Sequence, residues 1–348
     1  MDSNTHAYKN VLIIRQAALG DVANILPLIK LVRDAYPDAR LTCLTAGLTA
    51  PLLAADPCID EVLSFNRTLA LHRLLPMMWR LKNNTYDLVI DFHSSTCTKW
   101  LARSTGAPIR IGSKKAPFYT HQIKVDIRKH QACDVFRFFL APLGLAQKEI
   151  HPRFPSIETG VVSAKKVLER HQVSVPFLVF NPGHSPAWGT KRWPDAHWTA
   201  LGHFFVKQGF SILLSGGPGD SELTGRIATA IGTGVVDLAG KTDLFALAGI
   251  MKLSSAVVST DSGPMHVAAM SGAKVVALFG PTHPLTSSPF GPGHKVLHHK
   301  LHCSYCFKKV CPYQHECLDE MGPDEVMNAV QEILASNLAP TSMLDQQL

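Results

Sequence analysis

The chain has 348 residues, of which 46% are hydrophobic and 18% charged, and its formal net charge is +7. This composition excludes a disordered chain, and no apolar run approaches the 18–20 residues that a membrane-spanning helix needs. The positive charge favours anionic partners, and nucleic acid is the weakest of these because no long Lys/Arg run alternates with aromatic residues.

The first half of the chain alternates predicted strands and helices. Its first strand, at 10–15, is an apolar run that ends at Arg15 and is too short for the apolar segment of a signal peptide, so we expect a cytoplasmic protein. Apolar residues at helical spacing predict a helix at 21–36, which Pro37 ends. Further strands are predicted at 40–45, 61–65, 87–92 and 109–112.

The pattern loosens at 147–158 and then restarts with a helix at 159–171. Strands follow at 177–181, 210–215, 235–238, 256–260, 274–279 and 295–298, before a closing helix at 323–335. Buried strands linked by helices are typical of parallel sheets that are covered on both faces. We therefore predict an α/β protein with two doubly wound, Rossmann-like domains, at 1–155 and 156–335, and a flexible tail at 336–348. Ligands of such sheets bind beyond the carboxyl ends of the strands, so the two domains are expected to face a cleft.

The loop after the first strand contains a single glycine, Gly20, followed by Asp21. A dinucleotide-binding turn needs three glycines, and the chain contains no P-loop sequence, so both of these nucleotide sites are excluded. Asp21 opens the predicted helix at the edge of the sheet where ligands bind. It is interpreted either as a general base or as an N-cap of that helix.

Two loops of the second half carry residues that suit a nucleotide. Gly183 follows a strand, and the basic pair Lys191 and Arg192 precedes a helix that is predicted to start at Pro194. The start of this helix offers amides to a phosphate, and the basic pair offers positive charge. The alternative is that these two charges are ordinary solvated side chains. After the next strand a glycine-rich turn leads to Asp220 and Glu222, which would hold ribose hydroxyls or simply cap a turn.

The most informative segment is 258–266, a predicted strand, tight turn and helix start. Its polar residues are Thr260, Asp261, Ser262, Gly263 and His266. Free amides at the start of a helix, together with the helix dipole, favour a bound diphosphate. A Gly/Pro loop at 279–284 follows the next strand on the same side of the predicted sheet.

Together these motifs resemble the ADP-heptose:lipopolysaccharide heptosyltransferase family (glycosyltransferase family 9). The resemblance covers about residues 11–334 and is carried by G-D at 20–21, K-R-W-P at 191–194, D-S-G-P-M-H at 261–266 and F-G-P-T at 279–282. His130 and the stretch 91–112 also fit the family pattern. The resemblance implies the two-domain glycosyltransferase B architecture, with the acceptor bound by the N-terminal domain and the nucleotide sugar by the C-terminal one.

By this resemblance the protein is predicted to be an inverting, metal-independent transferase that uses no cofactor and moves heptose from ADP-heptose to the inner core of lipopolysaccharide. Asp21 would be the general base, and Lys191 would offset the charge of the leaving diphosphate. The predicted donor-binding residues are Gly20, Gly183, Lys191, Arg192, Asp220, Glu222, Thr260, Asp261, Ser262, Gly263 and His266. Two alternatives stay open: a related transferase that uses another nucleotide sugar, and a non-catalytic relative that binds lipopolysaccharide.

Basic patches in the first half are candidates for the acceptor side. Lys114, Lys115, Arg128 and His130 would hold acidic or phosphorylated inner-core sugars, with the surface of the inner membrane beyond them as a peripheral contact. The alternative for each patch is a solvated loop.

Four of the eight cysteines gather near the end of the chain, at Cys303, Cys306, Cys311 and Cys317. Thiols at this spacing suit a structural zinc ion or an iron–sulfur cluster, although the spacing matches no standard zinc finger. The alternative is a loop that contains four free thiols.

Overall fold

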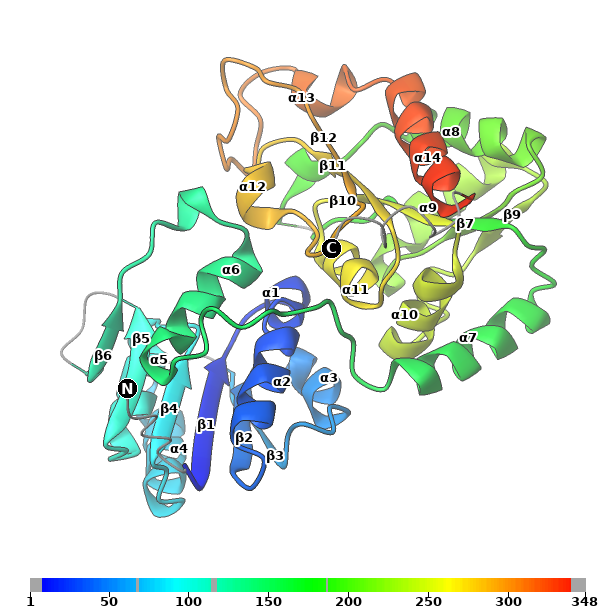
Figure 1. Ribbon diagram of the computed structural model, residues 1–348. Helices are drawn as coiled ribbons and strands as arrows, with labels where there is room; N and C mark the ends of the chain where they lie inside the picture. The colour runs from blue at the N-terminus through cyan, green and yellow to red at the C-terminus, as the bar shows by residue number, and fades with distance from the viewer. Residues whose placement is uncertain (1–7, 67–68, 114–117, 186, 339–348) are drawn as a thin grey trace, which may run out of the picture. The chain divides into compact units, whose positions relative to one another are not determined.

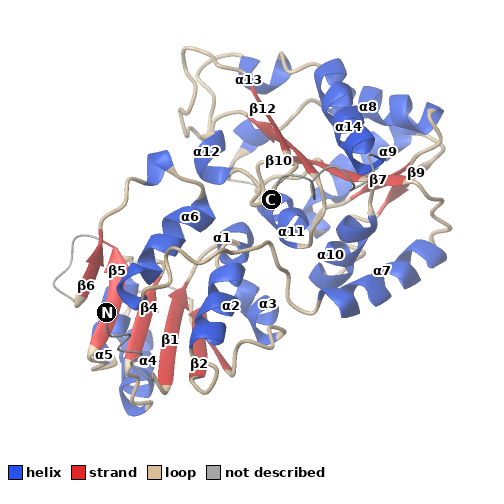
Figure 2. Ribbon diagram, viewed as in Figure 1, coloured by secondary structure: helices blue, strands red, loops and turns tan. Residues whose placement is uncertain are grey.

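The computed structural model describes residues 8–66, 69–113, 118–185 and 187–338 (Figure 1). The chain divides into two compact units, Met1–Ser156 and Ile157–Leu348. Each unit is a parallel sheet covered by helices (Figure 2). The prediction of two Rossmann-like α/β domains is therefore confirmed.

The first unit contains a six-stranded parallel sheet in the order β3-β2-β1-β4-β5-β6. Its strands are β1 (Asn10–Arg15), β2 (Arg40–Thr45), β3 (Glu61–Ser64), β4 (Leu88–Asp91), β5 (Ile109–Ser113) and β6 (His121–Ile123). The strand order reverses between β1 and β4, which pair directly. In doubly wound sheets the crevice beyond this reversal is where ligands bind.

The connections of this unit are helical. The α-helices are α1 (Leu19–Ala23), α2 (Leu26–Ala35), α3 (Ala50–Ala54), α4 (Leu71–Asn83), α5 (Thr96–Ser104) and α6 (Ala132–Arg137), and the 3-10 turns are η1 (Gly47–Thr49), η2 (Ile127–Lys129) and η3 (Phe138–Leu143). The single helix predicted at 21–36 is in fact two helices, α1 and α2. The break precedes Pro27, which lies in the first turn of α2, where a missing N–H and a fixed φ are tolerated.

One face of this sheet packs under α4 and α5. Leu12 and Ile14 of β1 join Leu74 and Leu81 of α4 and Leu101 of α5 in one buried apolar cluster. Because successive side chains of a strand point to opposite faces, the other residues of β1 face the helices on the opposite side. The strand is therefore buried on both sides, which explains its unbroken apolar sequence.

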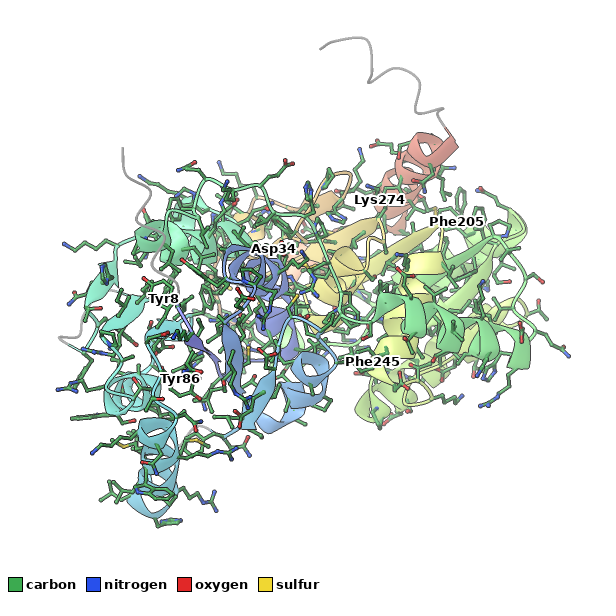
Figure 3. All side chains as sticks on the ribbon, turned by 60° about the horizontal axis from the view of Figure 1, so that its bottom comes forward. Tyr8, Asp34, Tyr86, Phe205, Phe245 and Lys274 are labelled. Atoms are coloured by element: carbon green, nitrogen blue, oxygen red, sulfur yellow. The ribbon has the colours of Figure 1, made fainter. Side chains whose placement is uncertain are left out.

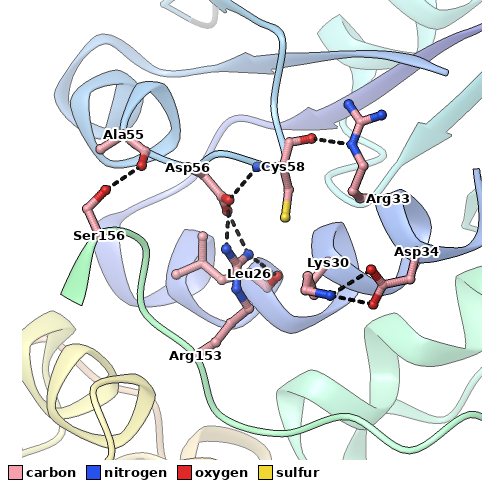
Figure 4. Close-up of polar contacts among 9 residues, drawn as sticks. All are labelled: Leu26, Lys30, Arg33, Asp34, Ala55, Asp56, Cys58, Arg153 and Ser156. Atoms are coloured by element: carbon pink, nitrogen blue, oxygen red, sulfur yellow. Dashed lines mark hydrogen bonds and ion pairs between the residues drawn. The ribbon is translucent and has the colours of Figure 1, made fainter. Parts of the chain in front are cut away.

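The last segment of the first unit is held by a buried carboxylate (Figure 4). Arg153 donates two hydrogen bonds to Asp56, of 2.8 and 2.7 Å, and a third of 3.2 Å to the carbonyl of Leu26. Ser156 donates to the carbonyl of Ala55 at 2.8 Å. Since the side chain of Asp56 is fully buried, its paired charge anchors residues 153–156 to α2 and α3.

The second unit repeats the strand order of the first, as β12-β11-β10-β7-β8-β9. Its strands are β7 (Phe177–Asn181), β8 (Ser211–Leu214), β9 (Val235–Asp237), β10 (Ala256–Thr260), β11 (Val275–Phe279) and β12 (Lys295–His298). Here the order reverses between β7 and β10.

The α-helices of the second unit are α7 (Ile157–Arg170), α8 (Asp195–Lys207), α9 (Ser221–Ile231), α10 (Leu244–Leu253), α11 (Gly263–Met270), α12 (Pro284–Ser287), α13 (Glu316–Asp319) and α14 (Pro323–Leu338). Short 3-10 turns lie at η4 (Gly189–Lys191) and η5 (Pro218–Asp220). Phe180, Trp193, Trp198 and Phe205 are the buried aromatic residues of the core cluster, and the indole of Trp193 donates to the carbonyl of Met321 at 2.8 Å. Helix α14 continues past the predicted end at 335, and residues 339–348 of the predicted tail lie outside the described residues.

Among the helices that the structure describes, none combines the length and the apolar composition that crossing a membrane requires.

Helices α7 and α10 touch through two glycines. A Cβ on Gly160 would lie 2.5 Å from the carbonyl oxygen of Phe245, which Figure 3 labels, and a Cβ on Gly249 would overlap the backbone of Gly160. Backbone atoms of a neighbouring helix cannot turn aside as a flexible side chain can. The contact therefore requires glycine at both positions.

We predict that Gly249→Ala lowers the free energy of unfolding by about 3 kcal/mol, because α7 and α10 must separate to admit the methyl group. The control is Gly225→Ala in α9, where a Cβ meets no atom within 4 Å. It removes the flexibility of a helical glycine and is expected to raise stability by about 0.5–1 kcal/mol. Urea titrations of both variants measure the difference, and equal effects would contradict the close helix contact.

Candidate functional site

The carboxyl ends of β7, β10 and β11 bring three predicted loops of the second unit together. The ammonium of Lys191 lies 2.7 Å from Oδ2 of Asp261, and the hydroxyl of Thr282 donates to the same oxygen at 2.6 Å. The side chain of Asp261 is only 6% exposed, so its negative charge is stabilised by Lys191 and Thr282 in place of water. Lys191 also lies over the ring of Trp188, 5.0 Å from its centroid.

A second set of hydrogen bonds fixes the backbone at the reversal of the strand order. The buried hydroxyl of Thr260 donates to the carbonyl of Gly183 at 2.8 Å, across the β7–β10 pair. Asn181 donates to the hydroxyl of Ser262 at 3.0 Å. His266 is buried in α11 behind these loops.

The N-terminus of α11 has no side-chain cap. Ser262 occupies the N-cap position, but its side chain does not accept from the first amides of the helix. Helix α11 starts at Gly263, which has no side chain to cover the amides. The result is a helix end whose amides and dipole are available to an anion.

Asp220 packs tightly against two glycines. A Cβ on Gly183 or on Gly216 would lie 2.7 Å from the side chain of Asp220. The carboxylate of Asp220 accepts from the amide of Gly217 at 2.8 Å and so closes the turn after β8. Asp220 therefore lies directly beside the Gly183 loop, with a structural hydrogen bond of its own.

Arg192 and Glu222 belong to a surface network of charges. Arg192 pairs with Asp195 at 2.8 Å, and Arg226 joins Asp195 and Glu222 at 3.0 Å each. Arg192 also lines a cavity of about 520 Å³ with His315. Arg192 and Glu222, both predicted to bind the donor, are therefore hydrogen-bonded to a different set of residues from Lys191 and Asp261.

Residues 303–317, which we call the cysteine segment, are hydrogen-bonded to the two loops that carry Lys191 and Thr282. Thr190 donates to the carbonyl of Lys308 at 2.7 Å, and the ring of His315 lies 2.7 Å from the carbonyl of Thr190. The amide of Phe307 donates to the carbonyl of Pro281 at 3.0 Å. The segment therefore braces both loops.

The four thiols of this segment line one small cavity of about 20 Å³. Burial, followed by the influence of Cys303, Cys311 and Cys306, raises the pKa of Cys317 to about 11. Within the described residues, no group of three or more His, Cys, Asp or Glu side chains is arranged to hold a metal ion. The thiols thus occupy a common neighbourhood without metal-site geometry.

In the first unit, Arg15 and Asp21 meet at the reversal of the strand order. Arg15 is buried at the end of β1 and donates to a carboxylate oxygen of Asp21 at 2.9 Å and to the carbonyl of Phe92, beyond β4, at 2.8 Å. Its guanidinium also lies 4.3 Å from the ring centroid of Phe136. Burial lowers the pKa of Arg15, against the effect of the charges of Asp21 and Asp91.

The position of Asp21 contradicts one of the two interpretations of its role, that of an N-cap. The N-cap of α1 is Ala18, and Asp21 lies inside the first turn with its side chain 51% exposed. It is held by Arg15 rather than bonded to the helix amides as a cap. An oriented and accessible carboxylate is what a general base requires.

A cavity of about 780 Å³ opens beyond β1, β4, β5 and β6. Arg15, His93, Ser113 and Lys124 are among its lining residues. The predicted acceptor residues Lys114 and Lys115 follow Ser113 but lie outside the described residues.

The other two predicted acceptor residues belong to the segment after β6. Arg128 is an exposed residue of η2, and His130 packs against Phe138 with ring centroids 4.9 Å apart. Neither is among the residues that line the cavity beyond β1 and β4.

A buried carboxylate, Asp91, supports the loop that follows β4. It accepts from the amides of His93 and Ser94, at 2.9 and 2.8 Å, and from the hydroxyl of Tyr119 at 2.6 Å. Burial raises the pKa of Asp91 in spite of these bonds. Gly112 makes room for Tyr119, whose ring atoms a Cβ at this position would overlap.

Sequence reasoning did not assign a role to Arg15 or Thr282. A charged residue that ends a buried apolar strand was the available signal for Arg15, since burial of a guanidinium requires partners. The F-G-P-T motif indicated that the loop at 279–282 belongs to the site. It did not predict that the hydroxyl of Thr282 donates to Asp261.

Comparisons with known proteins place these features in a family context. Residues 75–316 match the profile of glycosyltransferase family 9 (heptosyltransferase). The lipopolysaccharide heptosyltransferase 1 of Pseudomonas aeruginosa is 27% identical, over 96% of this chain and 99% of the relative. A glycosyl transferase family 9 structure from Veillonella parvula has a TM-score of 0.82 at 25% identity and covers 94% of this chain and 98% of its own.

Two further solved structures share the fold. The ADP-heptose lipopolysaccharide heptosyltransferase II of Escherichia coli has a TM-score of 0.77 at 22% identity, with 95% of this chain and 100% of that chain covered. The iron-containing dodecameric glycosyltransferase TibC of enterotoxigenic E. coli is more distant, with a TM-score of 0.57 at 16% identity and 94% and 79% covered.

We predict that Asp261→Ala lowers the free energy of unfolding by about 3 kcal/mol, because Lys191 and Thr282 lose their common acceptor in a largely buried setting. The control is Asp195→Ala, which breaks exposed ion pairs and is expected to cost less than about 1 kcal/mol. Thermal and urea unfolding without ligand measure both. A loss at Asp261 no larger than the loss at Asp195 would show that the pair is not structurally important.

Proposed function

The chain belongs to glycosyltransferase family 9, the heptosyltransferase family, and we propose that it transfers heptose from ADP-heptose to the inner core of lipopolysaccharide. The names of its relatives support this donor and acceptor: one is a lipopolysaccharide heptosyltransferase and another an ADP-heptose enzyme of the same fold. The proposal assigns the donor to the second unit and the acceptor to the first.

The observation that carries the proposal is the uncapped N-terminus of α11 beside Lys191. A nucleoside diphosphate sugar carries its negative charge on two phosphates, which suit helix amides and an ammonium group. Thr260, Ser262 and Gly263 bring these amides to the reversal of the strand order, where doubly wound sheets bind ligands. His266 follows in the same helix, and we assign it with them to the diphosphate and sugar.

Asp261 has a supporting part in this arrangement. Its carboxylate already accepts from Lys191 and Thr282, and phosphate oxygens of the same charge would be repelled from it. We therefore assign to Asp261 the task of holding the Lys191 ammonium toward the diphosphate. When the bond between the heptose and the phosphate breaks, Lys191 and the α11 amides offset the charge that develops on ADP.

The nearby loops complete the proposed donor site. Gly183 admits the side chain of Asp220 to the edge of the β7 loop, where a ribose would lie beside the phosphates. We assign Asp220 to the ribose in preference to Glu222, which is bonded to Arg226 at the surface. Arg192 is assigned a part in attracting the anionic donor.

Asp21 is the proposed general base, next to Gly20 in α1. The acceptor hydroxyl gives its proton to Asp21 as its oxygen forms a bond to the anomeric carbon, and ADP leaves from the opposite side with inversion. Buried Arg15 fixes the carboxylate of Asp21, whose side chain nevertheless stays 51% exposed. The cavity beyond β1 and β4 is the proposed place of the acceptor sugars.

The acceptor is proposed to be anionic and lipid-linked. Basic side chains at Arg128, His130, Lys114 and Lys115 supply charge for acidic inner-core sugars, the last two outside the described residues. A lipid-linked acceptor requires that the protein reach the cytoplasmic face of the inner membrane as a peripheral protein.

The transfer step as proposed involves no metal ion. Lys191 and helix amides supply the positive charge that a divalent cation would otherwise bring to the diphosphate. The cysteine segment is assigned a structural part, because its hydrogen bonds to Thr190 and Pro281 hold the loops of Lys191 and Thr282 in place.

The deciding experiment incubates the purified protein with ADP-heptose and a heptose-free lipopolysaccharide acceptor, with and without a chelator, and weighs the product by mass spectrometry. We expect a gain of one heptose that survives chelation. UDP- and GDP-linked sugars are tested in parallel, since a gain only from one of these would replace the donor assignment. Binding of acceptor without any transfer would indicate a non-catalytic relative.

Asp21→Asn is expected to reduce the turnover number by about 100- to 10,000-fold, since the amide cannot take the proton. The amide oxygen can still accept from Arg15, so the melting temperature and the Kd for ADP should stay unchanged. The matched control, Asp34→Asn, removes an exposed carboxylate paired with Lys30 and should leave transfer intact. Equal losses of binding, stability and transfer at Asp21 would make its role structural.

A further inference from the structure

Helix α4 exposes an apolar stripe on the side that faces away from its sheet. Leu71, Leu75 and Trp79 are spaced four residues apart, so they lie along one face of the helix. Their exposed fractions are 65%, 54% and 70%. The opposite face already fills the core through Leu74 and Leu81. Core packing therefore does not explain the outer stripe.

The neighbouring helix α5 continues this surface. Trp100 is 45% exposed and packs on Phe118 with ring centroids 4.8 Å apart. Trp79, Trp100 and Leu75 line a groove of about 780 Å³ between the two helices. Tyr86, labelled in Figure 3, lies at its buried base. We call this surface, with Leu71 and the basic residues beside it, the α4–α5 face.

The α4–α5 face is basic as well as apolar. Helices α4 and α5 together contain no Asp or Glu but five Lys and Arg. Lys82 and Arg103 line the groove itself. Within the described part of the chain, no salt bridge involves Lys82, Lys99 or Arg103, whereas Arg80 pairs with Glu61.

We propose that the α4–α5 face is a docking surface for the anionic headgroups of a lipid bilayer. Exposed Trp and Leu side chains flanked by Lys and Arg are the features of segments that lie in a membrane interface. Large apolar patches are otherwise costly on a soluble surface. A second copy of this chain is a poor occupant, because two identical faces would bring unpaired like charges together. This inference rests on the peripheral membrane contact of the proposed function and names the face that makes it, whereas vesicle binding can be measured without donor or heptosyl transfer.

The test is sedimentation of the purified full chain with vesicles of phosphatidylglycerol or of phosphatidylcholine. We expect strong binding to the first, weak binding to the second, and loss of binding as salt increases. The double variant Leu75→Gln/Trp79→Gln should reduce binding by about ten-fold or more, and Lys82→Gln/Arg103→Gln by a similar factor at low salt. Glutamine keeps the helices intact because it is a good helix former.

The matched control is Val162→Gln, which replaces a 56% exposed residue of helix α7 and should bind vesicles as the unchanged protein does. Melting temperatures show whether each variant is folded, and the Lys82/Arg103 pair serves if the apolar pair is not. Folded variants that bind phosphatidylglycerol as well as the control would overturn the proposal. So would a dimer, seen by sedimentation velocity, that Leu75→Gln/Trp79→Gln converts to monomers.

Discussion

The reversal of strand order in each sheet is the constraint on which the arrangement of the polar residues depends. At β1 and β4, and again at β7 and β10, neighbouring strands lead into connections that run in opposite directions. The crevice between such connections leaves backbone and side chains open to a ligand beyond a sheet that is buried on both faces. Arg15 spans the first crevice, and Thr260 ties the second.

In the second unit, helix α11 starts at the crevice without a side chain that caps its first amides. The nearby carboxylate of Asp261 instead accepts hydrogen bonds from Lys191 and Thr282. The cysteine segment adds stiffness because its backbone accepts a hydrogen bond from Thr190 and donates one to the carbonyl of Pro281, beside the two loops. Uncapped helix amides beside loops that hydrogen bonds hold in place suit an anion, because the protein needs little reorganisation when the anion binds.

The sequence predicted most of the fold because β-strands buried on both faces are continuous apolar runs. Strands β1, β2, β7, β10 and β12 have the predicted bounds. Strand β6 was missed because it has only three residues, of which His121 and Gln122 are polar and exposed at the sheet edge. Motifs marked the loops of the candidate site, but long-range partners such as Arg15 for Asp21 depend on where the strands end in space. Local patterns carry no such information.

Both units have the same strand order, yet the residues at their two crevices differ. The first holds a buried guanidinium and an exposed carboxylate; the second holds an ammonium, a buried carboxylate and open amides. The scaffold is thus duplicated while the chemistry is not. The hydrogen bonds described at each crevice lie within a single unit, so the loops of one crevice can change in sequence while those bonds of the other are kept.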